Sequence, residues 1–188
     1  MKATQPHVCP WWLGYFLTCP VRRFLADPAQ ILTPYVREGM TALEPGPGMG
    51  FFTLELARRV GASGRVIAVD IQPKMLERLK RRAAKAGLLD RIDARLAEPQ
   101  SIGLDGLASA VDFVLAFAVV HEMPDAGRLF VEAGQTMKSG AHLLLAEPTG
   151  HVSVEQFDAE LTKASAAGLE VVGRPSIRRS HAALLRKR

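Results

Sequence analysis

A glycine-rich segment at residues 43–53, Leu-Glu-Pro-Gly-Pro-Gly-Met-Gly-Phe-Phe-Thr, constrains the fold more than any other feature of the chain. A short apolar run at residues 40–43 leads into it and a helical pattern at residues 52–60 follows, which predicts a strand, a turn and a helix. Glycines in such a turn let the backbone approach a ligand closely, because no Cβ stands in the way. In open α/β sheets, ligands bind beyond the carboxyl ends of the strands, where this turn would lie. The spacing is G-x-G-x-G without a following Lys-Ser or Lys-Thr pair, so a Walker phosphate loop is excluded.

Strand and helix patterns alternate along the rest of the chain. Strands are predicted at residues 66–69, 92–96, 113–117, 143–146, 169–172 and 182–185. Helices are predicted at residues 73–86, 125–137 and 154–167. We expect residues 113–117 to form the central strand and residues 92–96 to lie nearer an edge. The alternation predicts an α/β fold, with a parallel sheet, right-handed crossovers and helices on both faces.

Residues 1–36 differ from the rest in being rich in aromatic residues and proline. Trp11, Trp12, Tyr15 and Phe16 fall at helical spacing, and a second helix is expected to open at Asp27-Pro28 and to run through Val36. With 188 residues the chain is long enough for one domain with a substantial core. We therefore predict an N-terminal helical arm at residues 1–36 and one α/β domain at residues 37–188.

Two acidic residues lie at the carboxyl ends of predicted strands, on the side of the sheet where a ligand would bind. Asp70 ends the second strand about 20 residues after the glycine turn, where a carboxylate accepts hydrogen bonds from both ribose hydroxyls of an adenosine. Glu98 follows the third strand and is a candidate acceptor for an adenine amino group. Alternatives are a purely structural glycine turn, a capping role for Asp70 and an ordinary surface acid at residue 98. Pro99 follows Glu98 and has no N–H to donate to the adenine ring.

These segments resemble the class I S-adenosylmethionine (SAM)-dependent methyltransferases over about residues 36–188. Residues 44–50 match the E/D-x-G-x-G-x-G motif, Asp70 matches the acid of the second motif and Ala97-Glu98 resembles the Gly-Asp pair of the third. Residues 113–124 resemble the small-molecule and quinone-biosynthesis group. The resemblance implies a doubly wound, mostly parallel seven-stranded sheet with an antiparallel last strand, preceded by the arm. It also implies SAM as cofactor, S-adenosylhomocysteine as product, and cofactor contacts from Glu44, Gly46, Gly48, Gly50, Asp70, Ile71, Glu98 and Ala116.

Methyl transfer from a sulfonium needs orientation of a nucleophile above all, and a base only when the acceptor must lose a proton. His121 and Glu122 follow the fourth strand and are the candidate bases. His121 and Tyr15 are also candidates for substrate contact. The alternatives are that His121 is a packing residue and that the aromatic arm is a hydrophobic lid or core segment.

Cys9 and Cys19, with His7, raise the hypothesis of a site for a soft metal ion or arsenic. Two cysteines and one histidine do not complete a tetrahedral site, and buried inert thiols are the favoured interpretation. No metal is expected, and two cysteines require no disulfide framework.

The formal charge of +5 makes the chain mildly basic, which favours anionic partners without establishing nucleic-acid binding. Clusters at residues 80–82 and 186–188 are interpreted as a solvated helix face and a solubilising tail. No N/D-P-P-Y/F motif follows the fourth strand, which argues against methylation of exocyclic base amines by that route. The expected function is methylation of a small-molecule acceptor. The alternatives are an RNA or protein methyltransferase and a non-catalytic SAM-binding module.

No apolar run approaches the roughly 18 residues of a transmembrane helix, and a cytoplasmic location is the expectation. Weak membrane contact through the Trp-rich arm, toward a lipid or quinone, is an alternative. The sequence is also compatible with a homodimer.

Overall fold

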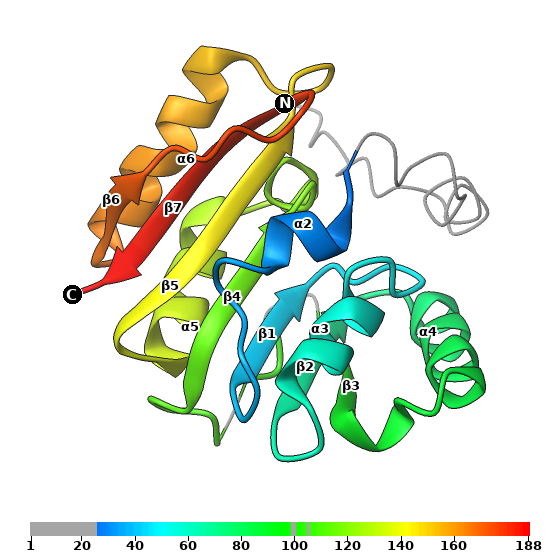
Figure 1. The fold of residues 1–188 in the computed structure, drawn as a ribbon. Helices are drawn as coiled ribbons and strands as arrows, with labels where there is room; N and C mark the ends of the chain where they lie inside the picture. The colour runs from blue at the N-terminus through cyan, green and yellow to red at the C-terminus, as the bar shows by residue number, and fades with distance from the viewer. Residues whose placement is uncertain (1–25, 99–100, 105) are drawn as a thin grey trace.

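The computed structural model describes residues 26–98, 101–104 and 106–188. Its strands form one seven-stranded sheet in the order β3-β2-β1-β4-β5-β7-β6 (Figure 1). The pairs among β1 to β5 are parallel, whereas β7 runs antiparallel to both β5 and β6. The predicted sheet with an antiparallel last strand is confirmed. The strands are β1 Thr41–Pro45, β2 Arg65–Asp70, β3 Ile92–Leu96, β4 Val111–Phe117, β5 Met137–Pro148, β6 Leu169–Gly173 and β7 Ser180–Lys187.

Helices cover both faces of the sheet (Figure 1). Phe113 and Leu115 of β4 share a core cluster with α2 and α3, while Val114 and Ala116 share one with α5 and α6. Alternate residues of a strand point to opposite faces, so β4 is buried from both sides, as its unbroken apolar run predicts. The helices are α2 Pro28–Leu32, α3 Thr53–Val60, α4 Pro73–Lys85, α5 Ala126–Thr136 and α6 Val154–Ala166, with short 3-10 helices η3 Leu89–Arg91 and η4 Val120–Glu122. In the described part of the chain, no helix has the length and apolarity needed to cross a membrane.

Two element boundaries differ from the sequence prediction by more than two residues. Helix α2 ends at Leu32 rather than Val36, because Pro34 lacks an N–H and disfavours helical backbone in the residue before it. Strand β5 begins at Met137 rather than residue 143, since Met137 already pairs with Val111 of β4 and the ladder resumes after an irregularity. The expected break at Gly140 therefore lies within a strand.

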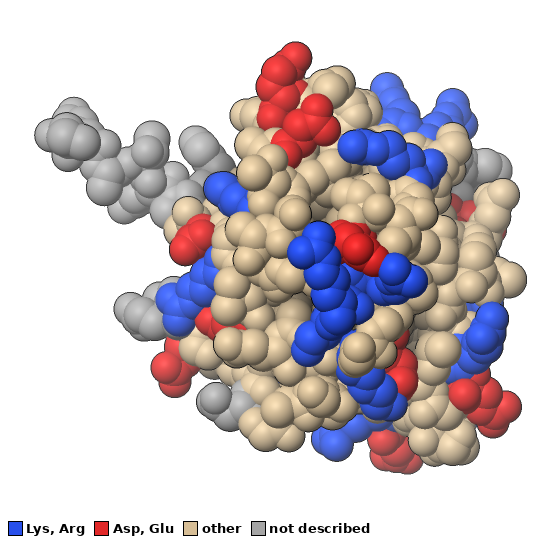
Figure 2. Space-filling model, turned by 90° about the vertical axis from the view of Figure 1, so that its left-hand side faces the viewer, with Lys and Arg blue, Asp and Glu red and all other residues tan. Residues whose placement is uncertain are grey.

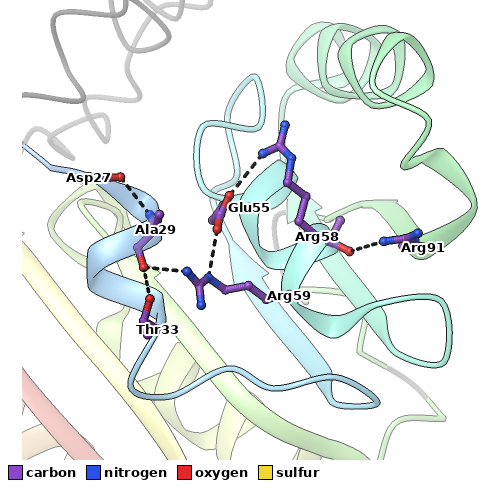
Figure 3. Close-up of polar contacts among 8 residues, drawn as sticks. Asp27, Ala29, Thr33, Glu55, Arg58, Arg59 and Arg91 are labelled. Carbon is purple, nitrogen blue, oxygen red and sulfur yellow. Dashed lines mark hydrogen bonds and ion pairs between the residues drawn. The ribbon is translucent and has the colours of Figure 1, made fainter.

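Residues 26–36 pack into the core that α3 and β4 share. Leu32 and Val36 are buried, and the ring of Tyr35 stacks on Phe113 with 5.9 Å between centroids. Figure 3 shows how α2 is held to α3: the Arg59 guanidinium donates to the Ala29 carbonyl at 2.9 Å and pairs with Glu55 at 3.0 Å. At the N-terminus of α2, the Asp27 carboxylate caps the helix by accepting the N–H of the same residue, Ala29.

Candidate functional site

A cavity of about 410 Å³ lies at the carboxyl ends of β1, β2 and β4, within the size range of small-molecule sites. The turn after β1 forms one wall, the end of β2 and the start of α4 form the second, and the segment after β4 forms the third. Its lining includes Gly46, Gly48, Asp70, Ile71, Gln72, Met75, Glu98, Ala118, Val119, Glu122, Met123 and Asp125.

The glycine turn has left-handed backbone at two positions that line the cavity. Gly46 has φ +66°, donates its N–H to the Val69 carbonyl at 2.8 Å, and lies so close to Val119 that a Cβ would overlap that side chain. Gly48 has φ +53°, and a Cβ there would meet nothing within 4 Å. Gly46 is therefore required by packing, whereas Gly48 keeps open space beside the cavity.

Asp70 connects the turn after β1 to the turn after β2. One carboxylate oxygen accepts the Gly48 N–H at 3.2 Å, and the other accepts the Gln72 N–H at 2.8 Å. The side chain is buried, and this desolvation raises the pKa of Asp70 to about 6 despite the two backbone donors, with the nearby Glu122 charge adding to the rise. Asp70 thus has a capping contact before α4 and also faces the cavity.

Three of the eight sequence-proposed cofactor residues lie behind the cavity wall rather than in it. Glu44 is buried and accepts the Thr53 hydroxyl at 2.6 Å, which links the end of β1 to the first turn of α3. Gly50 packs against Leu79 of α4, and Ala116 is fully buried in β4. The other five, Gly46, Gly48, Asp70, Ile71 and Glu98, line the cavity together.

Glu98 lies at the cavity mouth. Its N–H donates to the Ser101 carbonyl at 2.9 Å in a single antiparallel bridge, and its side chain is exposed. Its carboxylate can therefore meet a ligand without first leaving a buried position.

The two candidate bases occupy different positions. Glu122 lines the cavity, whereas His121 lies beside it with its Nδ1 bonded to the Glu147 carboxylate at the end of β5. This hydrogen bond raises the pKa of His121 more than burial lowers it. Sequence reasoning did not identify Glu147, whose only signal was an acid at the end of a predicted strand.

A second residue that sequence reasoning missed is Arg82 of α4. Its guanidinium donates to the Met49 carbonyl within the glycine turn, and partial burial lowers its pKa. The interpretation of residues 80–82 as a wholly solvated face is therefore wrong at Arg82. The expected tail is also corrected: Arg186 and Lys187 belong to β7, where Arg186 pairs with Glu170.

The cavity lining is acidic although the chain carries a formal charge of +5. Its charged residues are the carboxylates of Asp70, Glu98, Glu122 and Asp125 and the guanidinium of Arg128. Arg128 is itself paired with Glu132 at 2.7 Å. Such a lining favours a cationic ligand and opposes the phosphates of a dinucleotide or nucleoside triphosphate.

Four sequence-proposed residues, Tyr15, His7, Cys9 and Cys19, lie outside the described residues. Within residues 26–98, 101–104 and 106–188, no group of three or more His, Cys, Asp or Glu side chains is arranged to hold a metal ion.

Residues 36–176 match the model of a family described as a methyltransferase domain. The chain is 33% identical over 139 residues to a ubiquinone biosynthesis O-methyltransferase of Methylocella silvestris, covering 73% of the chain and 52% of the relative. It is 30% identical over 110 residues to an arsenite methyltransferase of Halobacterium salinarum, covering 58% and 27%.

Among solved structures, a SAM-dependent methyltransferase from Aquifex aeolicus superposes with a TM-score of 0.83 at 24% identity, covering 95% of this chain and all of that one. This similarity shows the fold. The chain spans between 27% and 59% of the length of the first curated relatives that it matches.

Proposed function

Since the chain belongs to the methyltransferase-domain family and has the fold of a SAM-dependent methyltransferase, we propose that it transfers the methyl group of SAM to a small-molecule acceptor and releases S-adenosylhomocysteine. The observation that carries this proposal is the acidic cavity at the glycine turn. SAM is an adenosine with a net positive charge, so its sugar suits Asp70 and its sulfonium suits the carboxylates around it.

Each wall of the cavity has a part in the proposed complex. Gly46 and Gly48 approach the methionine portion of SAM, Asp70 accepts the ribose hydroxyls, and Ile71 and Glu98 contact the adenine. Glu44 and Gly50 support these contacts from behind the cavity, since Glu44 binds Thr53 of α3 and Gly50 packs against Leu79 of α4. Ala116 is part of the core of β4 beneath the cavity. The two ribose hydroxyls of SAM are donors, and they fit the buried carboxylate of Asp70, which also accepts backbone N–H groups at 2.8 and 3.2 Å.

Small-molecule acceptors are favoured over RNA or protein. Two relatives act, by their names, on arsenite and in ubiquinone biosynthesis, whereas others are, by their names, protein and tRNA methyltransferases. The preference therefore rests on the chemistry at the end of β4, because Glu122 in the cavity wall and His121 beside it are suited to bind or deprotonate a small polar group. An RNA or protein acceptor stays an alternative that the turnover experiment below tests.

Calorimetry tests the cofactor assignment. Wild type is expected to bind SAM, and Asp70→Asn to bind it at least tenfold more weakly, with exposed Asp90→Asn as the matched control. Ionised Asp70 is the form that accepts two hydroxyls. Because its pKa in the free protein is about 6, SAM affinity should fall as pH drops below 6, by up to about tenfold per unit, while Asp70→Asn shows no such slope. Preference for ATP or NAD over SAM, or wild-type affinity in Asp70→Asn, contradicts the assignment.

Turnover tests the enzyme assignment. Transfer of label from methyl-labelled SAM is measured with four acceptor samples: a protein-free metabolite extract, total RNA, a protein extract, and a set of phenol, aniline and thioanisole. Formation of S-adenosylhomocysteine is followed separately in the same samples. Label in the small-molecule samples supports the proposal. Label in RNA or protein alone supports the rival acceptor class, and tight SAM binding without turnover in any sample supports a non-catalytic module.

A further inference from the structure

Glu147, the acid at the carboxyl end of β5, is fully buried and has three hydrogen-bonding partners around its carboxylate. Oε1 accepts the N–H groups of Val119 at 3.1 Å and Val120 at 2.8 Å, while Oε2 is bonded to Nδ1 of His121. Both carboxylate oxygens are therefore fixed by the segment that follows β4, and the imidazole is fixed in turn.

This arrangement selects one form of the imidazole ring. Because a carboxylate only accepts hydrogen bonds, Nδ1 must carry the proton, and in the neutral ring Nε2 is then the acceptor. Among the described residues, Nε2 of His121 has no hydrogen-bond partner. A buried carboxylate on Nδ1 with a free Nε2 is the arrangement in which an imidazole accepts a proton from substrate and the carboxylate stabilises the resulting cation.

Among the described residues, three further titratable side chains lie near the His121 ring. Glu122 lies in η4, Glu160 in α6 and His151 in the turn after β5. The His151 ring meets the His121 ring edge-on, with 5.6 Å between the ring centroids. Glu160 is buried, one of its oxygens has no hydrogen-bond partner among the described residues, and burial together with Glu147 raises its pKa to about 7. The surroundings are acidic and favour the protonated imidazole, which makes His121 a stronger base.

We propose that Glu147 is the positioning residue that holds His121 as proton acceptor for a methyl acceptor bearing O–H or N–H at the atom to be methylated. This inference rests on the proposed function and names its substrate class. In the step, Nε2 of His121 takes the acceptor's proton while the acceptor's electron pair forms the bond to the methyl carbon. The C–S bond breaks, its electron pair goes to sulfur, and S-adenosylhomocysteine leaves. The imidazolium is stabilised by Glu147 and later loses its proton to solvent.

The inference concerns acceptors with O–H or N–H, because only they have a proton to give up to a base as the bond to the methyl carbon forms. A thioether or a tertiary amine presents a lone pair directly, and a carboxylic acid is already ionised at neutral pH. A fixed carboxylate–imidazole pair beside the cavity would do nothing for them. For a phenol or an amine, general-base catalysis contributes about 10²–10⁴-fold.

The first experiment is ¹⁵N NMR of the histidine rings in the complex of the protein with S-adenosylhomocysteine, with His121→Asn to assign the signals. Wild type should show the neutral Nδ1–H tautomer and a His121 pKa above the ordinary value of about 6.5. Glu147→Gln keeps an oxygen for the Val119 and Val120 N–H groups but turns its amide N–H₂ to Nδ1, so the proton should move to Nε2 and the pKa should fall. An Nε2–H tautomer in wild type, or one insensitive to Glu147, overturns the proposal.

The second experiment compares kcat and KM for phenol, aniline and thioanisole across pH. We expect kcat for the first two to rise as His121 loses its proton, and Glu147→Gln to lower kcat about 10²–10⁴-fold with KM for SAM unchanged. Exposed Glu155→Gln on α6 is the matched control and should behave as wild type. An unshifted pH profile in Glu147→Gln, or faster transfer to thioanisole than to the protic probes, overturns the proposal.

Two checks keep the result decisive. If Glu147→Gln fails to fold by circular dichroism, His121→Asn replaces it, and wild-type kcat in that variant overturns the proposal. Calorimetry separates the two levels of inference. Absent SAM binding in wild type removes the proposed function, whereas intact SAM binding with unaltered proton transfer removes only the role of Glu147.

Discussion

Gly48 and Asp70 lie on either side of one hydrogen bond, and each depends on the other for its role. The Gly48 N–H reaches the Asp70 carboxylate at 3.2 Å only because the backbone of the turn takes a left-handed conformation at that residue. That bond holds the carboxylate at the cavity wall, but burial still leaves its charge under-solvated. In the proposed complex, ribose hydroxyls that donate to the carboxylate reduce this desolvation cost, and this contributes to the affinity that we expect for SAM.

Adding one methyl group, by the substitution Gly48→Ala, tests the structural role and the binding role of Gly48 separately. Gly48→Ala costs roughly 1 kcal/mol of unfolding free energy, because an L residue is strained at φ +53°, and its Cβ narrows the space for SAM. We expect SAM affinity to fall at least about tenfold, which is about 1.4 kcal/mol. Gly87→Ala is the control, since φ is +66°, no atom lies within 4 Å of its Cβ, and it is absent from the cavity lining.

Urea denaturation and calorimetry measure the two quantities. Equal loss of stability in the two variants, with loss of SAM affinity confined to Gly48→Ala, is the expected pattern. If Gly87→Ala weakens SAM binding to the same extent, the effect is one of general stability and the assigned role of Gly48 is wrong.

At the scale of elements, α4 holds the glycine turn from behind. Leu79 packs under Gly50, and Arg82, one turn further along the helix, reaches the Met49 carbonyl. The turn is therefore fixed by hydrogen bonds on both sides, from Asp70 at Gly48 and from Arg82 at Met49. Its conformation depends on α4 as much as on its own glycines.

Arg82→Met tests this support, with Arg81→Met as control. Methionine is a comparable helix former and keeps the apolar part of the side chain, so the change removes chiefly the charged hydrogen bond. We expect a loss of about 1–3 kcal/mol in unfolding free energy and a several-fold faster release of SAM. Arg81 is exposed, and its replacement should alter neither quantity. Stopped-flow dissociation of SAM makes the comparison, and identical release rates would show that the turn is rigid without Arg82.

The elements themselves were largely predictable from the sequence, because each has a periodic apolar pattern that needs no knowledge of its neighbours. What failed depended on distant partners. The early start of β5 follows from pairing between Met137 and Val111. The sequence alone does not show which of the three basic residues at 80–82 contacts the glycine turn, and the structure shows that it is Arg82. Glu147 is 26 positions from His121 in the chain, and only the fold brings its carboxylate to the ring.

For the whole molecule, the distribution of charge matters more than the net value of +5. On the face shown in Figure 2, basic and acidic side chains are interspersed rather than gathered into one basic surface. The ion pairs at β6, β7 and α6 have the same mixed character: Glu170 pairs with Arg186 and Arg188, and Asp158 with Arg174. A mixed charge on this face, together with an acidic cavity at the ends of β1, β2 and β4, agrees with a small cationic cofactor better than with a long polyanion.

The extent of the cooperative unit is also a property of the whole molecule. The glycine turn and its neighbours suggest a domain that begins at residue 37, yet residues 26–36 supply Leu32 and Val36 to the core and Tyr35 to the Phe113 ring. Burying each of the two aliphatic side chains contributes about 1.5–3 kcal/mol, and the ring pair about 0.5–1.5 kcal/mol. These sums are a large share of the 5–15 kcal/mol that stabilises a typical domain.

Two chains that differ only in this segment make the test, one beginning at Ala26 and one at Arg37. The chain that begins at Arg37 lacks Leu32, Val36 and the Tyr35 ring that stacks on Phe113, and it should lose about 4–7 kcal/mol of unfolding free energy, read from urea denaturation at matched concentration. Leu32→Ala in the longer chain should account for about 2–5 kcal/mol alone. Coincident denaturation curves for the two chains would mean that the core closes without residues 26–36. A shift of the expected size would instead make α2 part of the unit that positions β4 and, through β4, the segment carrying His121 and Glu122.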